Sequence, residues 1–238
     1  MEKAGKMNRR TVLRGTAAMA SMGAGHGRIA MPHGKSEDPS KDQCNIKLPK
    51  PSLRGKMTLE EAIARRRSVR EFSHRPLSLE EIAQFLWAAE GITGHAPYLR
   101  THPSAGGLHP LEVYLLDADG IFHYEPDVHR LRPVRQGDLR ADLAKAAHRQ
   151  WFLRDASCII AITAVFSRTT GKYGDWGRMR YVPMDAAHAA QNVLLQAVAL
   201  GLGAVPVGAF DDDMVRAVMH TPANEVPLYL IPIGKARA

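Results

Sequence analysis

The longest apolar-periodic segment of the chain, residues 184–200, constrains the fold most. It reads MDAAHAAQNVLLQAVAL, and Gly201 follows it directly. Apolar side chains recur there at the spacing of a helix, and glycine is the residue that most often follows the end of one. The segment therefore predicts a central, largely buried helix on which the other elements of one domain pack.

Two capping signals place further helices near the start of this domain. Thr58 with Glu61 and Ser78 with Glu81 each match the capping box, in which a hydroxyl and a glutamate satisfy the first backbone N–H groups of a helix. We expect one helix over 59–67 and a second that begins near residue 79 and ends near residue 91.

The remaining elements alternate irregularly between strand and helix patterns. Strands are expected over 112–116, 121–125, 158–166, 204–208 and 228–234, and helices over 138–148 and 212–219. Because helices and strands are interspersed at unlike spacings, the pattern indicates an α+β fold rather than regular βαβ repeats.

The first thirty residues look like a targeting signal rather than part of the fold. Arg9 and Arg10 are followed by a mildly apolar run of small residues over 15–25. This arrangement resembles a twin-arginine export signal, which implies a periplasmic or otherwise exported protein. A disordered basic tail on a cytoplasmic protein is the alternative.

The expected linker, residues 31–51, is polar and rich in Pro and Lys, so the folded domain is expected over 52–238. The charge agrees with this division. Residues 1–41 hold eight Lys or Arg and three Asp or Glu, which leaves only +3 of the net charge of +8 for the rest of the chain. The domain's charge gives no reason to expect a nucleic-acid partner.

Metal sites and membrane spans are not expected. The two cysteines, Cys44 and Cys158, belong to no cluster with metal-ligand spacing. No apolar stretch reaches the roughly 18 residues that a bilayer-spanning helix needs, so the sequence predicts no stable membrane insertion.

A first functional motif, RRSVREF, covers residues 66–72 and contains Arg66, Ser68 and Arg70 at alternate positions. A phosphate monoester carries nearly two negative charges and is bound best by several charge-assisted donors, which arginine supplies. Residues two apart in an extended segment point the same way. The motif predicts a phosphate site, and a solvated basic run is the alternative.

Later motifs combine glycines with polar residues. The segment PSAGGLHP (103–110) offers small side chains that let backbone approach a planar ring, and a simple surface turn is the alternative. The others are GKYGDWGRMRY (171–181), GLGAVPVGAF (201–210) and LYLIPIGK (228–235).

These motifs, in this order, resemble the nitroreductase superfamily, and specifically its SagB-type dehydrogenase branch, over residues 52–238. His109 stands where typical nitroreductases carry Gln, and this departure favours the SagB-type branch. The resemblance implies a mixed β-sheet flanked by helices, a homodimer, FMN bound non-covalently at the dimer interface, and a small molecule as substrate.

The resemblance also implies a role for each cofactor-binding residue. Backbone N–H groups near Val207 and Gly208 would face flavin N5 and O4. The FMN phosphate and ribityl chain would be held by Arg66, Ser68, Arg70 and Lys235. The loop that reaches across the dimer interface onto the partner's flavin would contain Pro103, Ser104, Ala105 and Gly106.

Lys172 and Tyr173 form the pair that the resemblance implicates in proton removal from substrate. A lysine with a lowered pKa or a tyrosine suits a base beside a carbon that loses hydride. The surrounding sequence is polar and glycine-rich, so a mobile loop with an exposed Lys172 is the alternative.

The hypothesis that follows is a ping-pong oxidoreductase that transfers hydride through flavin N5. A G-x-G-x-x-G motif with its acidic partner is absent from the sequence. NAD(P)H as electron donor would therefore dock directly on the flavin. A peptide azoline dehydrogenase that uses oxygen and a non-catalytic FMN carrier are the alternatives.

Overall fold

The computed structural model describes residues 45–73, 75–94 and 99–237, so the expected export signal, Cys44 and most of the expected linker lie outside the described residues. The strands are β1 (Ile46–Lys47), β2 (Phe72–Ser73), β3 (Leu111–Leu116), β4 (Gly120–Glu125), β5 (Arg130–Gln136), β6 (Cys158–Ala164), β7 (Gly203–Ala204) and β8 (Val226–Ala236). The helices are α1 (Leu59–Arg65), α2 (Leu79–Glu90), α3 (Arg140–Ala146), α4 (Phe152–Asp155), α5 (Ser167–Trp176), α6 (Val182–Ala199) and α7 (Asp212–Met219), with a 3-10 turn η2 (Ala105–Gly107) and a π-helical segment η3 (Gly177–Tyr181).

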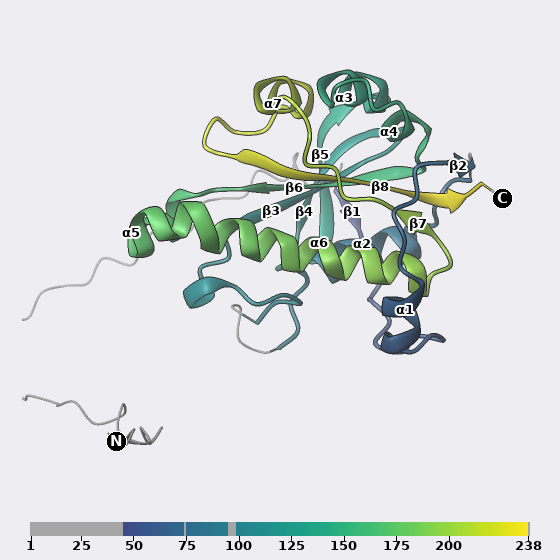
Figure 1. Ribbon diagram of the computed structural model, residues 1–238, viewed down its shortest axis with the longest axis horizontal. Helices are drawn as coiled ribbons and strands as arrows, with labels where there is room; N and C mark the ends of the chain where they lie inside the picture. Colours follow the sequence, from purple (N-terminus) through teal and green to yellow (C-terminus); the bar gives the residue numbers. More distant parts are fainter. Residues whose placement is uncertain (1–44, 74, 95–98, 238) are drawn as a thin grey trace, which may run out of the picture. The chain divides into compact units, whose positions relative to one another are not determined.

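The strands form one eight-stranded sheet in the order β1-β5-β4-β3-β6-β8-β2, with β7 paired to β8 (Figure 1). Each of these ladders is antiparallel. The α+β fold class is confirmed, and within the described ranges the mixed character of the sheet is limited to one parallel bridge between Ser68 and Ala204.

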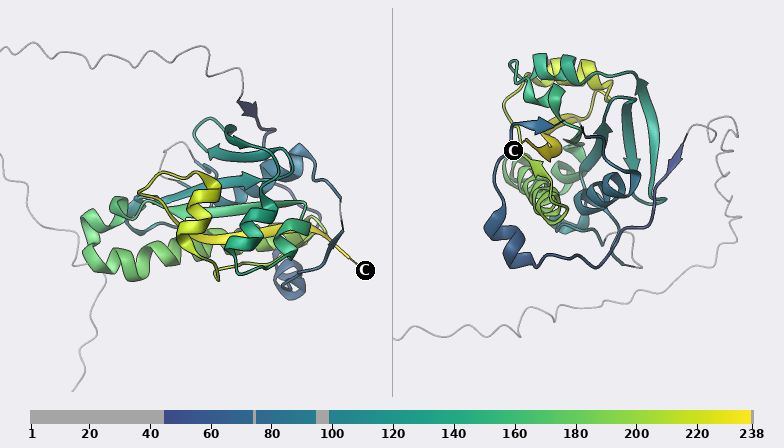
Figure 2. Two further views of the ribbon diagram at one scale, coloured as in Figure 1. Left: turned by 90° about the horizontal axis from the view of Figure 1, so that it is seen from above. Right: turned by 90° about the vertical axis from the view of Figure 1, so that its right-hand side faces the viewer.

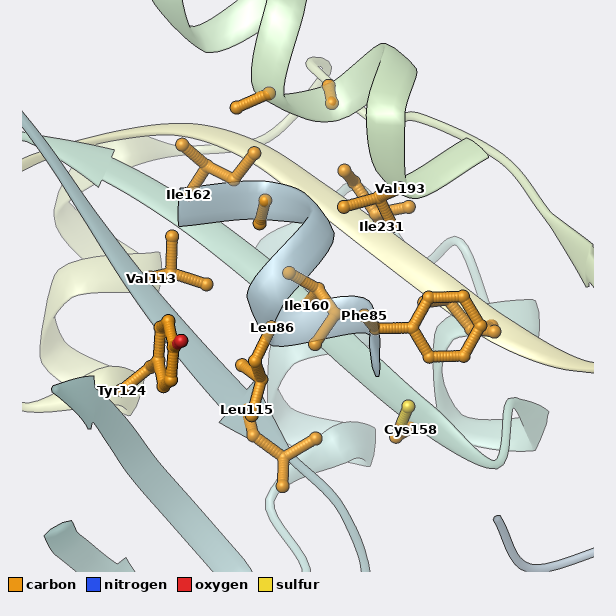
Figure 3. Packing of buried hydrophobic residues seen from close by; sticks show 14 of the residues in the cluster. Phe85, Leu86, Val113, Leu115, Tyr124, Cys158, Ile160, Ile162, Val193 and Ile231 are labelled. Carbon is orange, nitrogen blue, oxygen red and sulfur yellow. The ribbon is translucent and has the colours of Figure 1, made fainter. Parts of the chain in front are cut away.

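Helices cover both faces of the sheet, with α2 and α6 on one side and α3, α4 and α7 on the other (Figure 1). Strand β6 is buried along its whole length, and its side chains alternate between the two cores. Ile160 and Ile162 pack toward α2 and α6, and Figure 3 shows Ile160 near Leu86 and Ile162 near Val113. Ile159 and Ala161 pack on the opposite face.

The two predicted capping boxes are confirmed. Thr58 accepts from the Glu61 N–H at 3.2 Å and Ser78 accepts from the Glu81 N–H at 3.2 Å, while each glutamate bonds back to the N-cap N–H. The central helix is also confirmed as α6, and Gly201 follows its end with a φ of 69°. None of the helices in the described ranges is both long and apolar enough to cross a bilayer.

The expected linker boundary at residue 51 needs correction. Ile46 pairs with Leu131 of β5, and Leu48 is only 5% exposed within the core. The backbone carbonyl of Pro49 lies 2.8 Å from His129 Nε2, which ties this segment to the sheet. The sequence did not indicate this strand because prolines and lysines surround Ile46 and Leu48. These two apolar side chains, at alternate positions, are enough to add an edge strand to the sheet.

The polar segment 171–181, for which a mobile loop was the alternative interpretation, is helical. Helix α5 covers most of it, η3 continues without a break into α6, and Gly174 (φ 53°, ψ −137°) marks a kink. Glycine lowers helix propensity, which is why the sequence alone suggested a loop, but continuity with a long packed helix overrides propensity. The predicted strand 204–208 reduces to β7 and a single bridge between Val207 and Leu230.

Candidate functional site

A basic cluster forms where the chain leaves α1. The Val69 N–H donates to the Ala204 carbonyl at 3.1 Å, and Ser68 bridges the same residue, so the segment runs beside β7. A Cβ on Gly203 would lie 2.7 Å from Val69 Cβ. Glycine at that position therefore allows the two backbones to approach closely.

Lys235 joins this cluster through the sheet. It pairs with Ser73 of β2, and its neighbour Gly234 pairs with Gly203 of β7. Lys235 Nζ lies 3.4 Å from the Gly201 carbonyl. We call Arg66, Ser68, Arg70 and Lys235 the basic cluster; they gather at the end of the sheet where β2, β7 and the C-terminus meet, which faces the viewer in the right-hand view of Figure 2.

The arginines of this run differ in their partners. Arg65 pairs with Glu61 at 3.5 Å, and Arg67 donates to the carbonyls of Ala64 and Arg66. Among the residues that the structure describes, no carboxylate pairs with the guanidinium of Arg66 or Arg70. The Arg70 guanidinium lies over the Phe152 ring, 5.9 Å from its centroid. Two guanidiniums without carboxylate partners, on a segment that also carries a hydroxyl and runs beside β7 near Lys235, have the chemistry of a phosphate site.

The second group of predicted residues lies on a loop that we call the Ser104 loop, Pro103–His109. Gly106 and Gly107 both have a φ of 65°, and His109 has a φ of 43°, so the backbone is held in left-handed conformations. The Ser104 hydroxyl donates to Asp185 Oδ2 at 2.6 Å and accepts from the His109 N–H at 3.0 Å. These bonds fasten the loop to the first turn of α6.

Lys172 and Tyr173 lie against this loop. A Cβ on Gly106 would be 2.7 Å from the Tyr173 hydroxyl and 3.2 Å from Lys172 Nζ. The Lys172 ammonium lies 5.2 Å from the centroid of the Tyr173 ring, and the Tyr181 ring packs edge-on at 5.0 Å from Tyr173. The structure thus brings the predicted catalytic pair to the predicted flavin-facing glycine.

The basic cluster and the Ser104 loop lie at opposite ends of α6. Asp185, which holds the loop, is in the first turn, and Gly201, which contacts Lys235, follows the last turn. The rise of a helix separates these two residues by roughly 24 Å. The Ser104 loop and the basic cluster of one chain are therefore two separate groups, one at each end of the long helix α6 in Figure 1.

The expected backbone donors near Val207 require a correction. The Val207 N–H donates to the Leu230 carbonyl at 2.8 Å and so cannot face a flavin, because the segment pairs with β8. Gly208 is exposed, and its N–H has no backbone partner among the described residues. Of the two expected donors, only the Gly208 N–H is left without a backbone partner in the part of the chain that the structure describes.

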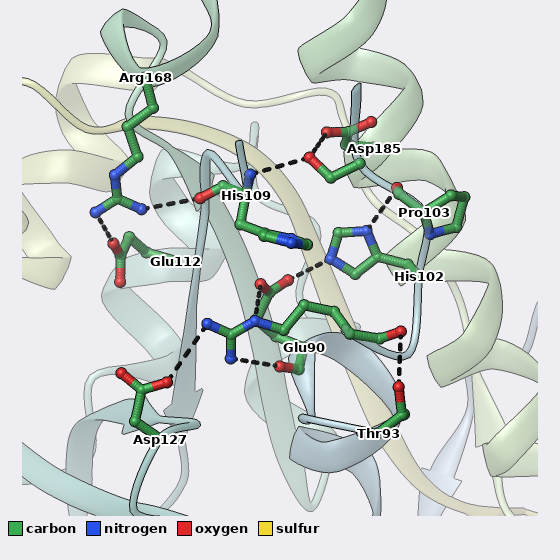
Figure 4. Close-up of polar contacts among 11 residues, drawn as sticks. Glu90, Thr93, His102, Pro103, His109, Glu112, Asp127, Arg168 and Asp185 are labelled. Carbon is green, nitrogen blue, oxygen red and sulfur yellow. Dashed lines mark hydrogen bonds and ion pairs between the residues drawn. The ribbon is translucent and has the colours of Figure 1, made fainter. Parts of the chain in front are cut away.

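Sequence reasoning missed a buried polar group behind the Ser104 loop (Figure 4). Glu90 at the end of α2 hydrogen-bonds His102 Nε2, and its other oxygen lies 3.6 Å from Arg100 Nε. With His109, Glu90 and Arg100 line a cavity of about 400 Å³. No motif announces this group, because its members come from separate elements and only the fold brings them together.

The comparisons with known proteins agree with this architecture. The chain matches the Nitroreductase family over residues 63–235. A Methanocaldococcus jannaschii protein assigned as a nitroreductase is 41% identical over 183 residues, covering 74% of this chain and 90% of that protein. A crystal structure of a Ralstonia eutropha protein assigned as a nitroreductase has a TM-score of 0.74 at 29% identity, covering 82% of this chain and 91% of the other.

A more distant structure shows the same fold. It is the NADPH:FMN oxidoreductase of Vibrio harveyi in complex with NAD+, with a TM-score of 0.56 at 20% identity. The match covers 76% of this chain and 69% of that one.

Proposed function

Because this chain belongs to the nitroreductase family and is an oxidoreductase of that family, we propose that it uses FMN, acts as a homodimer and falls in the SagB-type dehydrogenase branch. The observation that carries the cofactor assignment is the basic cluster. Arg66, Ser68 and Arg70 on the segment after α1 and Lys235 on β8 meet at one end of the sheet, and neither arginine has a carboxylate partner among the described residues.

The residues present fit an FMN phosphate. Arg66 and Arg70 supply forked donors that no described carboxylate occupies, and Lys235 adds a third positive charge. The Gly208 N–H, which has no backbone partner within the described ranges, would be a donor that orients a planar ring. A ligand with a dianionic phosphate and an aromatic ring matches this set better than a neutral ligand would.

Bound FMN would supply hydride transfer at its N5 atom, between a donor such as NAD(P)H and a small-molecule acceptor. The chain's own residues would then bind, orient and move a proton. The basic cluster would hold the phosphate, and Lys172 or Tyr173, which lie against Gly106 of the Ser104 loop, would exchange a proton with the substrate.

The separation of the two groups along α6 supports the homodimer. If the Ser104 loop of one protomer lies over the cofactor held by the basic cluster of the other, both groups serve one site. A two-fold axis then gives two equivalent sites, as expected for an isologous dimer. Exposed apolar side chains on α1, Leu59 and Ile63, are one turn apart and offer a surface that such a partner could cover.

The candidate activities within this family differ in the class of substrate. The Lys172–Tyr173 pair against Gly106 favours a dehydrogenase that removes a proton along with hydride, as in the oxidation of peptide azolines. A nitro or quinone reductase fed by NAD(P)H needs no such pair. A flavin carrier would show stoichiometric FMN and no turnover with a panel of donors and acceptors.

Changing Lys172 to Met and Tyr173 to Phe together is expected to lower turnover roughly 100-fold or more while FMN content stays at the wild-type level. The reason is that both side chains lie against the flavin-facing loop and away from the basic cluster. Tyr181→Phe is the matched control, because Tyr181 packs on Tyr173 without contacting Gly106. Steady-state kinetics together with a flavin assay measure both quantities. Full turnover in the double variant would contradict a proton-transfer role for Lys172 and Tyr173.

A further inference from the structure

His102 is buried directly behind the Ser104 loop and uses both ring nitrogens. Its side chain is fully enclosed, with Nδ1 3.0 Å from the Pro103 carbonyl and Nε2 hydrogen-bonded to Glu90 (Figure 4). Glu90 is also buried, at 3% exposure. The histidine therefore connects the end of α2 to the first residue of the loop.

The chemistry of these partners fixes how many protons the pair must hold. A carbonyl oxygen only accepts, so the bond to Pro103 requires a hydrogen on Nδ1. The bond to Glu90 requires a second hydrogen, carried either by Nε2 or by the carboxyl group. A neutral imidazole beside an ionised carboxylate has one hydrogen, and it can hold Pro103 or Glu90 but not both.

We infer that His102 and Glu90 share this additional proton and act as positioning residues that hold Pro103 and the Ser104 loop in their flavin-facing place. The loop's role rests on the proposed function, but the shared proton does not. Asp185 fastens the same loop from α6 through Ser104, and Arg168 fastens its far end by donating to the His109 carbonyl at 3.1 Å. Loss of the proton releases the attachment at Pro103.

The charged surroundings favour retention of the proton. Burial by itself lowers the pKa of His102, but the hydrogen bond and charge of Glu90, the Pro103 carbonyl and the charge of Asp185 together raise it above its ordinary value. Arg100 faces Glu90 from the other side, and the His109 ring packs edge-on at 6.2 Å from His102. Because the pKa is raised, the attachment is complete at and below the ordinary range of histidine and is lost as the pH rises through the raised value.

A divalent cation bound by Glu90 and His102 is the alternative to the shared proton. Glu90, His102 and His109 offer ligand atoms within 4.8 Å of one another. The Arg100 guanidinium, however, already lies beside the Glu90 carboxylate, and a cation would have to displace the proton next to that positive charge. The geometry therefore favours the proton.

The test uses the full-length holoprotein and Glu90→Gln. The Gln amide can donate to His102 Nε2 and accept from Arg100, so it keeps both contacts without a proton that titrates. Wild-type kcat is expected to fall on the alkaline side, by up to about tenfold per pH unit above the raised pKa, and this fall should disappear in the variant. Glu225→Gln is the matched control, since Glu225 is also a buried carboxylate but accepts from Tyr114 and Thr163, which lie outside the Ser104 loop.

A second measurement is independent of flavin and turnover. In protein with ¹⁵N-labelled histidine, His102 should keep two hydrogens shared over its ring and Glu90 at a pH where exposed histidines carry one, and Glu90→Gln should abolish this signature. A singly protonated His102 next to an ionised Glu90 overturns the inference, as does an alkaline fall of kcat that persists in Glu90→Gln. Stoichiometric metal in the purified protein that is lost on His109→Ala overturns it in favour of a metal site.

Discussion

Changing Arg66 and Arg70 together to alanine is expected to give a colourless protein that retains no FMN. Each guanidinium has no carboxylate partner in the described chain, so a phosphate gains its charge-assisted bonds in full. If each arginine contributes about 1.5–3 kcal/mol, the double change weakens FMN binding by roughly 100-fold to 10,000-fold. Flavin absorbance of the purified protein and a titration with added FMN measure the effect.

A matched control comes from the same run of arginines. Arg65→Ala with Arg67→Ala removes the same charge, but Arg65 pairs with Glu61 and Arg67 bonds backbone carbonyls. This control should stay yellow. If it lost FMN as completely as the Arg66 and Arg70 variant, the effect would be one of general charge, and the phosphate assignment would be wrong.

A second large effect is expected from Gly106→Val. Gly106 has a φ of 65°, and its Cβ would meet the Tyr173 hydroxyl at 2.7 Å, so the loop or the side chains of Lys172 and Tyr173 must shift from their present positions. We expect turnover to fall roughly 100-fold, because small displacements of a catalytic group have effects of that size. FMN content should remain, since the basic cluster is untouched. Gly137→Val controls for strain, because Gly137 has a φ of 90° and nothing within 4 Å of the added Cβ.

The same two variants test whether the loop works across the dimer. A mixed dimer of a Gly106→Val protomer and an Arg66→Ala, Arg70→Ala protomer has one site with both an intact basic cluster and an intact loop, provided that the loop acts on the partner. Mixing the two inactive variants should then restore activity in proportion to the mixed dimers. No recovery, with mixed dimers shown to form, would place the loop over its own chain's site.

Much of the fold followed from local signals in the sequence. The capping boxes at Thr58 and Ser78 and the apolar period of residues 184–200 describe interactions within one element, so they could be recognised without the rest of the chain. Strand β5 could not be recognised in this way, because its sequence RLRPVRQ is charged and contains proline. Its extended conformation comes from pairing with β4 along its length. Helix α5 was hidden by its glycines in the same way.

The candidate site likewise combines local motifs, which the sequence shows, with long-range contacts, which it does not. Arg66, Ser68 and Arg70 form one local motif, but their approach to Lys235 depends on the pairing of β7 and β2 with β8. The bond between Ser104 and Asp185 joins residues 81 positions apart, and the contact of Glu90 with His102 joins residues 12 positions apart across the end of α2. Neither contact follows a sequence motif, so neither could be predicted from the sequence. The pairing of Val207 with Leu230 likewise depends on the folded sheet.

The most direct test of the central claim is an absorption spectrum of the purified protein, before and after anaerobic addition of NADPH or NADH. An FMN oxidoreductase should be yellow, with flavin bands that bleach when a competent donor is added. A colourless protein that also takes up no added FMN would contradict the assignment.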